Sequence, residues 1–238
     1  MNQIIIQQEE YDSKRGIAKS SSPLVLAHIS TILKLKPGDS CKLIILNESL
    51  AQAEIVNIDS KNVEFKILKM FDGEEPWINL YIGLSRPPTC KKILEHATTL
   101  GARSFTFFTT KLSEKSYSTS KLWQDGAYLE FLYAGLSQSK KYFQIPRVEL
   151  KKSIRDLDFP RDNLFLLSLE SKDWFNKDKI KRNQINVAVG SERGWTEDEE
   201  IFFETKGFKK IKISDSTMRV EHATIAVMSQ LEFLLKSN

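Results

Sequence analysis

The chain has 238 residues, of which 41% are hydrophobic and 28% charged, values typical of a globular protein with a sizeable core. Its net charge of +4 is compatible with a polyanionic partner but does not require one. No apolar run approaches the roughly 20 residues that cross a bilayer, and the first residues lack the basic start and apolar stretch of a signal peptide, so we expect a cytoplasmic protein with no membrane partner.

The first part of the chain, to about residue 70, is rich in short strand patterns. Residues 41–46 and 51–56 flank a polar turn, which predicts a hairpin, and residues 63–68 alternate apolar and polar side chains as a half-buried strand does. Pro37 and Gly38 predict a further turn, because proline fixes φ and glycine accepts a positive φ. Consecutive short strands with little helix predict a small β-barrel over residues 1–72.

The pattern changes after residue 72, where Asp72, Gly73 and Pro76 predict a linker. From there strands alternate with helices, which predicts an α/β domain with a mostly parallel sheet over residues 73–238. Thr196 and Glu199 predict a capping box at the start of the third helix. The strands are expected at 78–84, 104–108, 164–169, 185–189 and 210–213, and the helices at 87–101, 121–137, from 197 onward and at 217–236.

Two segments at the carboxyl ends of predicted strands are the candidate ligand site, because ligands of open α/β sheets bind there. Residues 190–195 follow one strand and residues 214–219 follow another. Neither contains G-x-G-x-x-G or G-x-x-x-x-G-K-[ST], which excludes the phosphate-binding loops of dinucleotide dehydrogenases and P-loop NTPases. Gly190 and Gly194 either let the backbone approach a ligand or serve only as turn residues. Trp195 is expected to pack beneath the loop.

Residues 140–155 combine cations with aromatic side chains. Lys140 and Lys141 precede Tyr142 and Phe143, and further cations follow. Such a mixture suits phosphate contact together with base stacking on a nucleic acid. A solvated basic surface is the alternative.

Metal binding is not expected. The two cysteines, Cys41 and Cys90, are far apart and form no C-x-x-C pair, and the chain has only three histidines. These counts exclude a zinc ribbon, a disulfide framework and a His-rich site.

Motifs in and around the two strand-end segments follow a known pattern. Residues 190–199 read Gly-Ser-Glu-Arg-Gly-Trp-Thr-Glu-Asp-Glu, against the pattern G-P-E-G-G-[FL]-S-x-x-E. Residues 213–223 read Ile-Ser-Asp-Ser-Thr-Met-Arg-Val-Glu-His-Ala, against L-G-x-R-[IV]-L-R-x-E-T-A. Weaker matches at 28–39, 97–102, 113–116 and 138–146 occur in the same order. On these motifs the chain resembles the bacterial small-subunit ribosomal RNA uridine-N3 methyltransferases, a branch of the SPOUT, or trefoil-knotted, superfamily.

The resemblance implies a fold and an activity. It implies a PUA-like β-barrel RNA-binding domain at residues 1–72, and a SPOUT-type, trefoil-knotted α/β methyltransferase domain with a mostly parallel sheet at residues 73–238. It also implies S-adenosyl-L-methionine as the methyl donor, N3 of a uridine in 16S ribosomal RNA as the acceptor, and a homodimer. The alternative is a SPOUT-family RNA-binding protein that is non-catalytic or has a different RNA target.

The same resemblance implies a cofactor site and two catalytic residues. N3 of uridine becomes a good nucleophile only as its proton leaves, and Arg219 is expected to stabilise the developing anion from beside the base carbonyl groups. Glu221 cannot share a helix face with Arg219, so we expect it to orient a loop or a facing subunit. A solvated helix N-terminus is the other interpretation of this pair. The implied cofactor-binding residues are Leu169, Gly190, Ser191, Glu192, Gly194, Ile213, Ser214, Thr217 and Met218.

Six residues are expected to contact RNA. His28 matches a family histidine, although a hydrogen-bonded structural role is the alternative. Several positions depart from the family pattern, among them Ser191, which replaces a proline, Arg193, which replaces a glycine, and Ser216, which replaces an arginine. Arg193 either bulks up the cofactor loop or points outward to hold an RNA phosphate. The six residues are His28, Lys34, Arg86, Lys140, Lys141 and Arg193.

Overall fold

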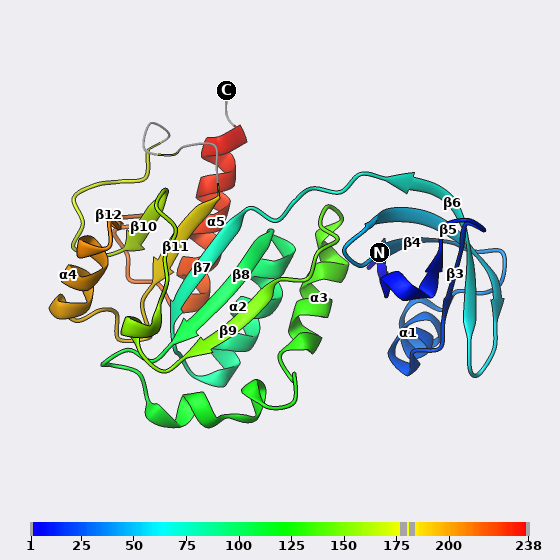
Figure 1. The fold of residues 1–238 in the computed structure, drawn as a ribbon, viewed down its shortest axis with the longest axis horizontal. Coiled ribbons are helices and arrows are strands. Elements are labelled where there is room, and N and C mark those ends of the chain that lie inside the picture. Colours follow the sequence, from blue (N-terminus) through cyan, green and yellow to red (C-terminus); the bar gives the residue numbers. More distant parts are fainter. Residues whose placement is uncertain (1, 177–179, 181–183, 237–238) are drawn as a thin grey trace. The chain divides into compact units, whose positions relative to one another are not determined.

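The computed structural model describes residues 2–176, 180 and 184–236, and it divides the chain into two compact units. The first comprises Met1–Glu75 with Leu136–Ile145, and the second comprises Pro76–Gly135 with Pro146–Asn238. Each unit contains one six-stranded sheet (Figure 1).

The sequence predicted a single boundary after residue 72, but the first unit also includes the later segment 136–145. Asn47 N donates a hydrogen bond to Phe143 O at 2.9 Å, and Glu74 N donates to Lys141 O at 2.8 Å. These backbone bonds join the segment to the first unit. They link residues far apart in the chain, so a boundary drawn from local sequence patterns does not detect them.

The sheet of the first unit has the strand order β1-β4-β5-β6-β3-β2. The expected hairpin is confirmed as the antiparallel pair β4–β5, and β6 pairs with β5 as the next strand. β1, β2 and β3 are not expected from the sequence, because strands of two to four residues are too short to show an alternating pattern. The bounds are β1 (Ile4–Ile6), β2 (Tyr11–Asp12), β3 (Ile17–Ser20), β4 (Ser40–Ile45), β5 (Ser49–Ile58) and β6 (Val63–Phe71).

A helical segment of the first unit follows β3. The short helix α1 (Pro23–Ala27) continues into a π-helical turn, η2 (His28–Leu33). The turn stops at Lys34, whose φ of 53° is left-handed. Ile29 anchors the segment, because its side chain is fully buried in the core with Phe65. The remaining single turns, all 3₁₀, are η1 (Gln8–Glu10), η3 (Lys115–Thr119), η4 (Lys121–Trp123) and η5 (Ile154–Asp156).

The sheet of the second unit has the strand order β12-β10-β11-β7-β8-β9, and every neighbouring pair is parallel. The predicted parallel sheet is therefore confirmed. All five residues of β11 are buried, as expected for a parallel strand covered on both faces. The bounds are β7 (Ile78–Gly83), β8 (Ala102–Phe108), β9 (Arg147–Lys151), β10 (Leu164–Leu167), β11 (Ile185–Val189) and β12 (Lys209–Ile211).

Helices α2, α4 and α5 belong to this unit, and α2 packs beside α5 (Figure 1). α3 begins in this unit, and its residues from Leu136 onward belong to the first unit. The capping box is supported by Glu199, whose side chain accepts from Thr196 N at 2.9 Å ahead of α4. The bounds are α2 (Pro87–Thr99), α3 (Leu129–Ser139), α4 (Glu197–Thr205) and α5 (Val220–Lys236).

Two helix starts predicted from the sequence are wrong. The helix expected from residue 121 begins only at Leu129, because Asp125 (φ 49°) and Gly126 (φ 72°) are left-handed and cannot continue an α-helix. The helix expected from residue 217 begins at Val220, because Ser216 N bonds to the Ser214 side chain at 3.0 Å in a local turn.

Two predicted strands also end earlier than expected. β10 stops at Leu167 and β12 at Ile211, so Leu169 and Ile213 lie in loops. The carboxyl ends of β10, β11 and β12, which are adjacent in the sheet, thus carry three neighbouring loops. Within the described part of the chain, no helix combines the length and apolar character needed to cross a membrane.

Candidate functional site

The loops after β10, β11 and β12 enclose a cavity of about 360 Å³. This volume falls within the range of roughly 300–1,000 Å³ that is typical of small-molecule sites. Strand-end residues such as Leu167, Val189 and Ile211 form its apolar wall. All nine residues predicted to bind the cofactor line it, which are Leu169, Gly190, Ser191, Glu192, Gly194, Ile213, Ser214, Thr217 and Met218. Arg193 and Ser216, two of the positions that depart from the family pattern, line it as well.

The loop after β11 needs glycine for steric reasons. Gly194 has a φ of 75° and donates its N–H to Ser191 O at 2.8 Å, closing a tight turn. A Cβ on Gly190 would lie 3.1 Å from Gly194 Cα. A Cβ on Gly83, at the end of β7, would lie only 2.5 Å from Ser191 N. Gly83 is not among the predicted site residues, although a glycine closing a buried strand is a signal of close backbone approach.

Trp195 anchors this loop to the interior. Its indole Nε1 donates to Leu167 O at 3.0 Å, which joins the loop after β11 to the end of β10. The ring is nearly parallel to Phe108, at a centroid distance of 6.1 Å, and meets Phe203 edge-on at 5.0 Å. The prediction that Trp195 packs beneath the loop is confirmed, and the same side chain also borders the cavity.

A pair of acidic residues on α4 stabilises the surroundings of the cavity. Glu199 is buried and accepts from Lys111 N at 2.8 Å, in addition to its bond with Thr196 N. Glu200, which borders the cavity, accepts from the Ser168 hydroxyl at 2.8 Å and lies 2.9 Å from Lys210 Nζ. The hydrogen bond to Glu200 raises the pKa of Lys210.

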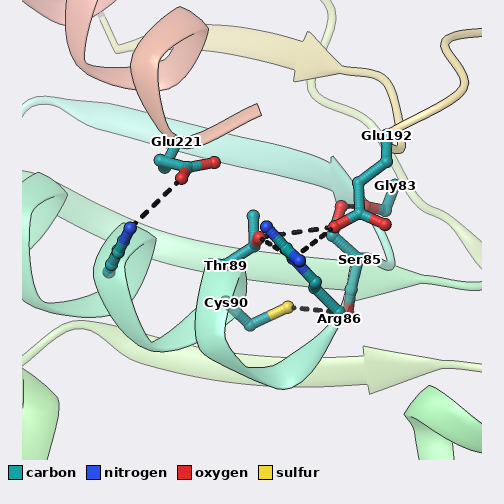
Figure 2. A network of polar contacts seen from close by, with 8 residues as sticks. Gly83, Ser85, Arg86, Thr89, Cys90, Glu192 and Glu221 are labelled. Atoms are coloured by element: carbon teal, nitrogen blue, oxygen red, sulfur yellow. Dashed lines mark hydrogen bonds and ion pairs between the residues drawn. The ribbon is translucent and has the colours of Figure 1, made fainter. Parts of the chain in front are cut away.

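Glu192 reaches from the cavity loop to the neighbouring segment between β7 and α2 (Figure 2). Its Oε1 lies 3.2 Å from Arg86 Nε and 3.4 Å from the Thr89 hydroxyl. Arg86 Nε also donates to Thr89 Oγ1 at 3.3 Å. Arg86, predicted to bind RNA, is therefore paired with a predicted cofactor residue.

The two candidate catalytic residues lie at the start of α5, and neither lines the cavity. Arg219 is exposed, and its carbonyl accepts the first helical bond, from Ala223 N at 2.9 Å. Its side chain makes no hydrogen bond or ion pair with the described residues. Because Met218 and Val220 do line the cavity, Arg219 stands at its rim.

Glu221 is buried, so the solvated-terminus interpretation is wrong for this residue. Its carboxylate lies 3.5 Å from Lys92 Nζ on α2. Burial alone would raise the pKa of Glu221, but a backbone hydrogen bond and the Lys92 ammonium outweigh it and hold the pKa below its ordinary value. Glu221 thus stays ionised and connects α5 to α2.

The residues predicted to contact RNA fall in both units. Lys34 and Lys140 are exposed in the first unit, where Lys141 lies 3.8 Å from Glu74. His28 is half-buried, and its Nε2 is enclosed without a hydrogen-bond partner among the described residues. In the second unit Arg86 is paired with Glu192, whereas Arg193 is exposed at the cavity.

The basic segment 140–155 is partly neutralised. Residues 147–151 form the edge strand β9, where the sequence predicted no strand. Glu149 lies 3.4 Å from Arg147 Nε and 2.8 Å from Lys151 Nζ. The hydrogen bond from Lys151 lowers the pKa of Glu149, so both cations face a carboxylate.

Thiol and metal chemistry find no support in the described residues. Burial raises the pKa of Cys41 and of Cys90 to about 12, so neither thiol is a nucleophile at neutral pH. Within the ranges that the structure describes, no group of three or more His, Cys, Asp or Glu side chains could hold a metal ion.

Comparison with known proteins gives the class of this protein. The sequence model of the RNA methyltransferase domain matches residues 73–232, and that of the RNA methyltransferase PUA domain matches residues 26–68. The chain therefore belongs to the RNA methyltransferase family, with a PUA-like domain ahead of the methyltransferase domain. The resemblance stated from the motifs is confirmed.

Within this family the chain is similar to the small-subunit methyltransferases E. It is 32% identical over 231 residues to "Ribosomal RNA small subunit methyltransferase E 1" of Borreliella burgdorferi, covering 95% of each chain. It is 28% identical over 237 residues to "Ribosomal RNA small subunit methyltransferase E" of Treponema pallidum, covering 95% of this chain and 88% of the relative. Its fold matches that of the Neisseria gonorrhoeae methyltransferase E crystallised with S-adenosyl methionine, with a TM-score of 0.82 at 19% identity over 98% of each chain.

Proposed function

We propose that this chain transfers the methyl group of S-adenosyl-L-methionine to N3 of a uridine in the 16S ribosomal RNA of the small subunit. The observation that carries the proposal is the cavity at the ends of β10, β11 and β12, in which all nine predicted cofactor residues meet. Two comparisons support ribosomal RNA as the substrate. The chain belongs to the RNA methyltransferase family, and its relatives are named as methyltransferases of small-subunit ribosomal RNA.

The cavity fits the chemical parts of this cofactor. Leu167, Val189 and Ile211 offer an apolar wall for the adenine ring, and the loop glycines bring backbone N–H and C=O groups close to the ribose and methionine portions. The carboxylate of Glu170 borders the same space, and its charge complements the sulfonium and ammonium groups. When bound, the cofactor supplies a methyl group activated by a positively charged sulfur.

The main task of the chain in such a transfer is positioning, because donor methyl, acceptor nitrogen and leaving sulfur must lie nearly in line. Arg219 is exposed at the rim, directly after the lining residue Met218. In our proposal its guanidinium meets the uracil carbonyl oxygens and stabilises the negative charge that develops as N3 loses its proton to solvent water. Glu221, buried beside Lys92, positions the first turn of α5 and thereby Arg219.

RNA contact is assigned in this proposal to the first unit and to the cavity rim. Lys34 and Lys140 are exposed cations of the first unit, and Lys141 and His28 belong to the same unit. Arg193 offers an exposed cation at the cavity. Lysine and arginine contacts to phosphate account for much of the affinity of RNA-binding proteins and make it depend on salt.

Three further properties complete the proposal. The methyltransferase domain carries a trefoil knot, the protein is a homodimer, and it acts in the cytoplasm, where ribosomal RNA is found. These properties follow from the motif resemblance and from the proposed substrate. Light scattering coupled to gel filtration tests the dimer: a monomer at micromolar concentration contradicts it.

The proposed function is tested with purified protein, labelled S-adenosylmethionine and small ribosomal subunits that lack the modification. Mass spectrometry of the digested RNA should detect N3-methyluridine at one position. Methylation of another nucleoside or another RNA would replace the proposed target. Calorimetry that detects no S-adenosylmethionine binding at millimolar concentration would instead favour a non-catalytic RNA-binding protein.

A further inference from the structure

The cavity loop 190–194 makes few bonds of its own. Within the described backbone its internal closure is the bond from Gly194 N to Ser191 O, at 2.8 Å. The side chains of Ser191 and Glu192 also contact two other segments of the second unit. One is the segment between β7 and α2, and the other is the segment after β8.

The contact with the first segment is ionic (Figure 2). Glu192 Oε1 faces Arg86 Nε at 3.2 Å and the Thr89 hydroxyl at 3.4 Å. Thr89 is buried in the first turn of α2, so its position is set by the helix. Arg86 in turn donates to Thr89 Oγ1 at 3.3 Å. The carboxylate is therefore held against a rigid helix start by two donors.

The contact with the second segment is made by hydroxyl groups. The buried Thr110 donates to Ser191 Oγ at 3.2 Å, and Ser191, also buried, donates to Gly194 O at 3.3 Å. Thr110 Oγ1 lies 2.9 Å from Ser113 Oγ, which donates to Leu84 O at 2.7 Å. A chain of hydroxyls thus runs from the cavity loop to the residue that follows β7.

Two consecutive loop residues, Ser191 and Glu192, are consequently held from two sides. We propose that Arg86 and Thr110 are positioning residues, which preorganise the 190–194 loop for the cofactor through Glu192 and Ser191. This inference rests on the proposed function, since it takes the cavity to be the S-adenosylmethionine site. It also gives Arg86 a role in the cofactor pocket in place of the RNA contact expected from the sequence.

The consequence for binding follows from preorganisation. A loop that is already ordered loses less conformational freedom when the ligand binds, so freeing it weakens binding without removing a direct contact. Arg86 and Thr110 do not line the cavity, whereas Glu192 and Ser191 do. Substitutions at Arg86 and Thr110 therefore test the support of the loop separately from its contacts with the ligand.

The experiment is calorimetric titration of S-adenosylmethionine and of S-adenosylhomocysteine into the full-length protein and its variants. Arg86→Gln should raise the Kd about threefold, as expected for loss of a partly exposed ion pair, and Thr110→Val about fivefold, as expected for loss of a buried hydrogen bond. Thr110→Ser keeps the hydroxyl and should bind like the original protein. Arg103→Gln and Thr119→Val, at exposed positions outside these contacts, are the matched controls.

Two further readouts separate positioning from general stability and from RNA contact. In a Glu192→Gln background, Arg86→Gln should add almost nothing, because the partner is already lost. RNA affinity of Arg86→Gln, measured without cofactor, should stay within about twofold of the original. A drop in RNA affinity at unchanged cofactor affinity would overturn the inference. If the original protein and both variants bind the cofactor equally well, this inference is wrong but the proposed function stands. If the original protein does not bind the cofactor, the proposed function is wrong as well.

Discussion

Glu221 in the first turn of α5 lies 3.5 Å from Lys92 on α2, and its carboxylate is almost completely enclosed. The two helices cover the sheet side by side, and α5 begins directly after the loop that closes the candidate cofactor cavity. The ion pair therefore sets the position of the segment that carries Arg219. Because this buried carboxylate is ionised, we expect it to contribute to the free energy of unfolding in a way that depends on pH.

Replacing Glu221 by Gln should lower the free energy of unfolding by about 1–3 kcal/mol at pH 7, because the buried charge-assisted bond with Lys92 is lost. The pKa of Glu221 is depressed in the folded state, so its contribution is complete above the ordinary carboxyl value of 4.5 and disappears as the pH falls through the lower folded-state value. Urea unfolding at a series of pH values should show the two proteins converging below that range. The exposed Glu114→Gln serves as control, and a difference that persists unchanged in acid would contradict the assignment.

Replacing Gly83 by Ala should displace the cavity loop, because the new Cβ would lie 2.5 Å from Ser191 N. We expect a loss of about 1–3 kcal/mol in stability, as for other overpacked sites, and a loss of cofactor binding. Calorimetry and thermal unfolding measure the two effects. Gly38→Ala is the control, since it strains a positive φ of 90° in the first unit with no atom within 4 Å. Cofactor affinity that is equally lowered by both substitutions would argue against a local effect.

Replacing Trp195 by Phe should retain most of the packing against Phe108 and Phe203 but remove the bond to Leu167 O. The partly buried carbonyl left without its donor should destabilise the protein by about 1 kcal/mol, and cofactor affinity should fall because the loops after β10 and β11 are no longer joined. The half-exposed Trp174→Phe is the comparison. If both substitutions have equal effects on affinity, the indole bond is not what joins the loops.

Replacing Arg219 by Ala should lower the rate of methyl transfer about 100- to 1,000-fold while leaving cofactor affinity within a few-fold, because the residue stands at the rim and not in the lining. Single-turnover methylation with saturating cofactor measures the rate, and calorimetry measures the affinity. The exposed Arg161→Ala should change neither. Loss of cofactor binding in the Arg219 variant would place this residue in the cofactor shell instead.

Replacing Lys34 and Lys140 by Ala should weaken RNA binding, and each substitution should reduce the slope of log affinity against log salt by about 0.7–1 if the residue contacts a phosphate. Both are exposed lysines of the first unit. Lys14→Ala, another exposed lysine of that unit, provides the matched control. A uniform loss at all three positions would indicate a diffuse charge effect rather than specific contacts.

Much of the second unit is readable from local sequence, because its central strands are continuous apolar runs and α4 begins at a clear capping box. β11 and the start of α4 at Thr196 illustrate both signals. β9 is missed because its alternating charges resemble an exposed basic segment, and only its pairing with β8 shows that it is an edge strand. The start of α3 is misjudged because two left-handed residues interrupt an otherwise helical composition.

The sequence by itself indicated that the second unit is an α/β domain with a parallel sheet, and its motifs indicated the methyltransferase family. The motifs also indicated the nine residues that line one cavity, because strand-end loops and motif spacing are local properties of the chain. Only the tertiary structure decided which side chains those residues meet. Arg86 lies 106 positions before Glu192 and Thr110 lies 81 positions before Ser191 in the chain, yet parallel strand order brings each pair into contact. From the sequence, Glu221 was expected either to orient a loop or a facing subunit or to lie at a solvated helix N-terminus. Helix packing instead buries it in an ion pair with Lys92. Such pairings depend on strand register and helix packing, which no local pattern contains.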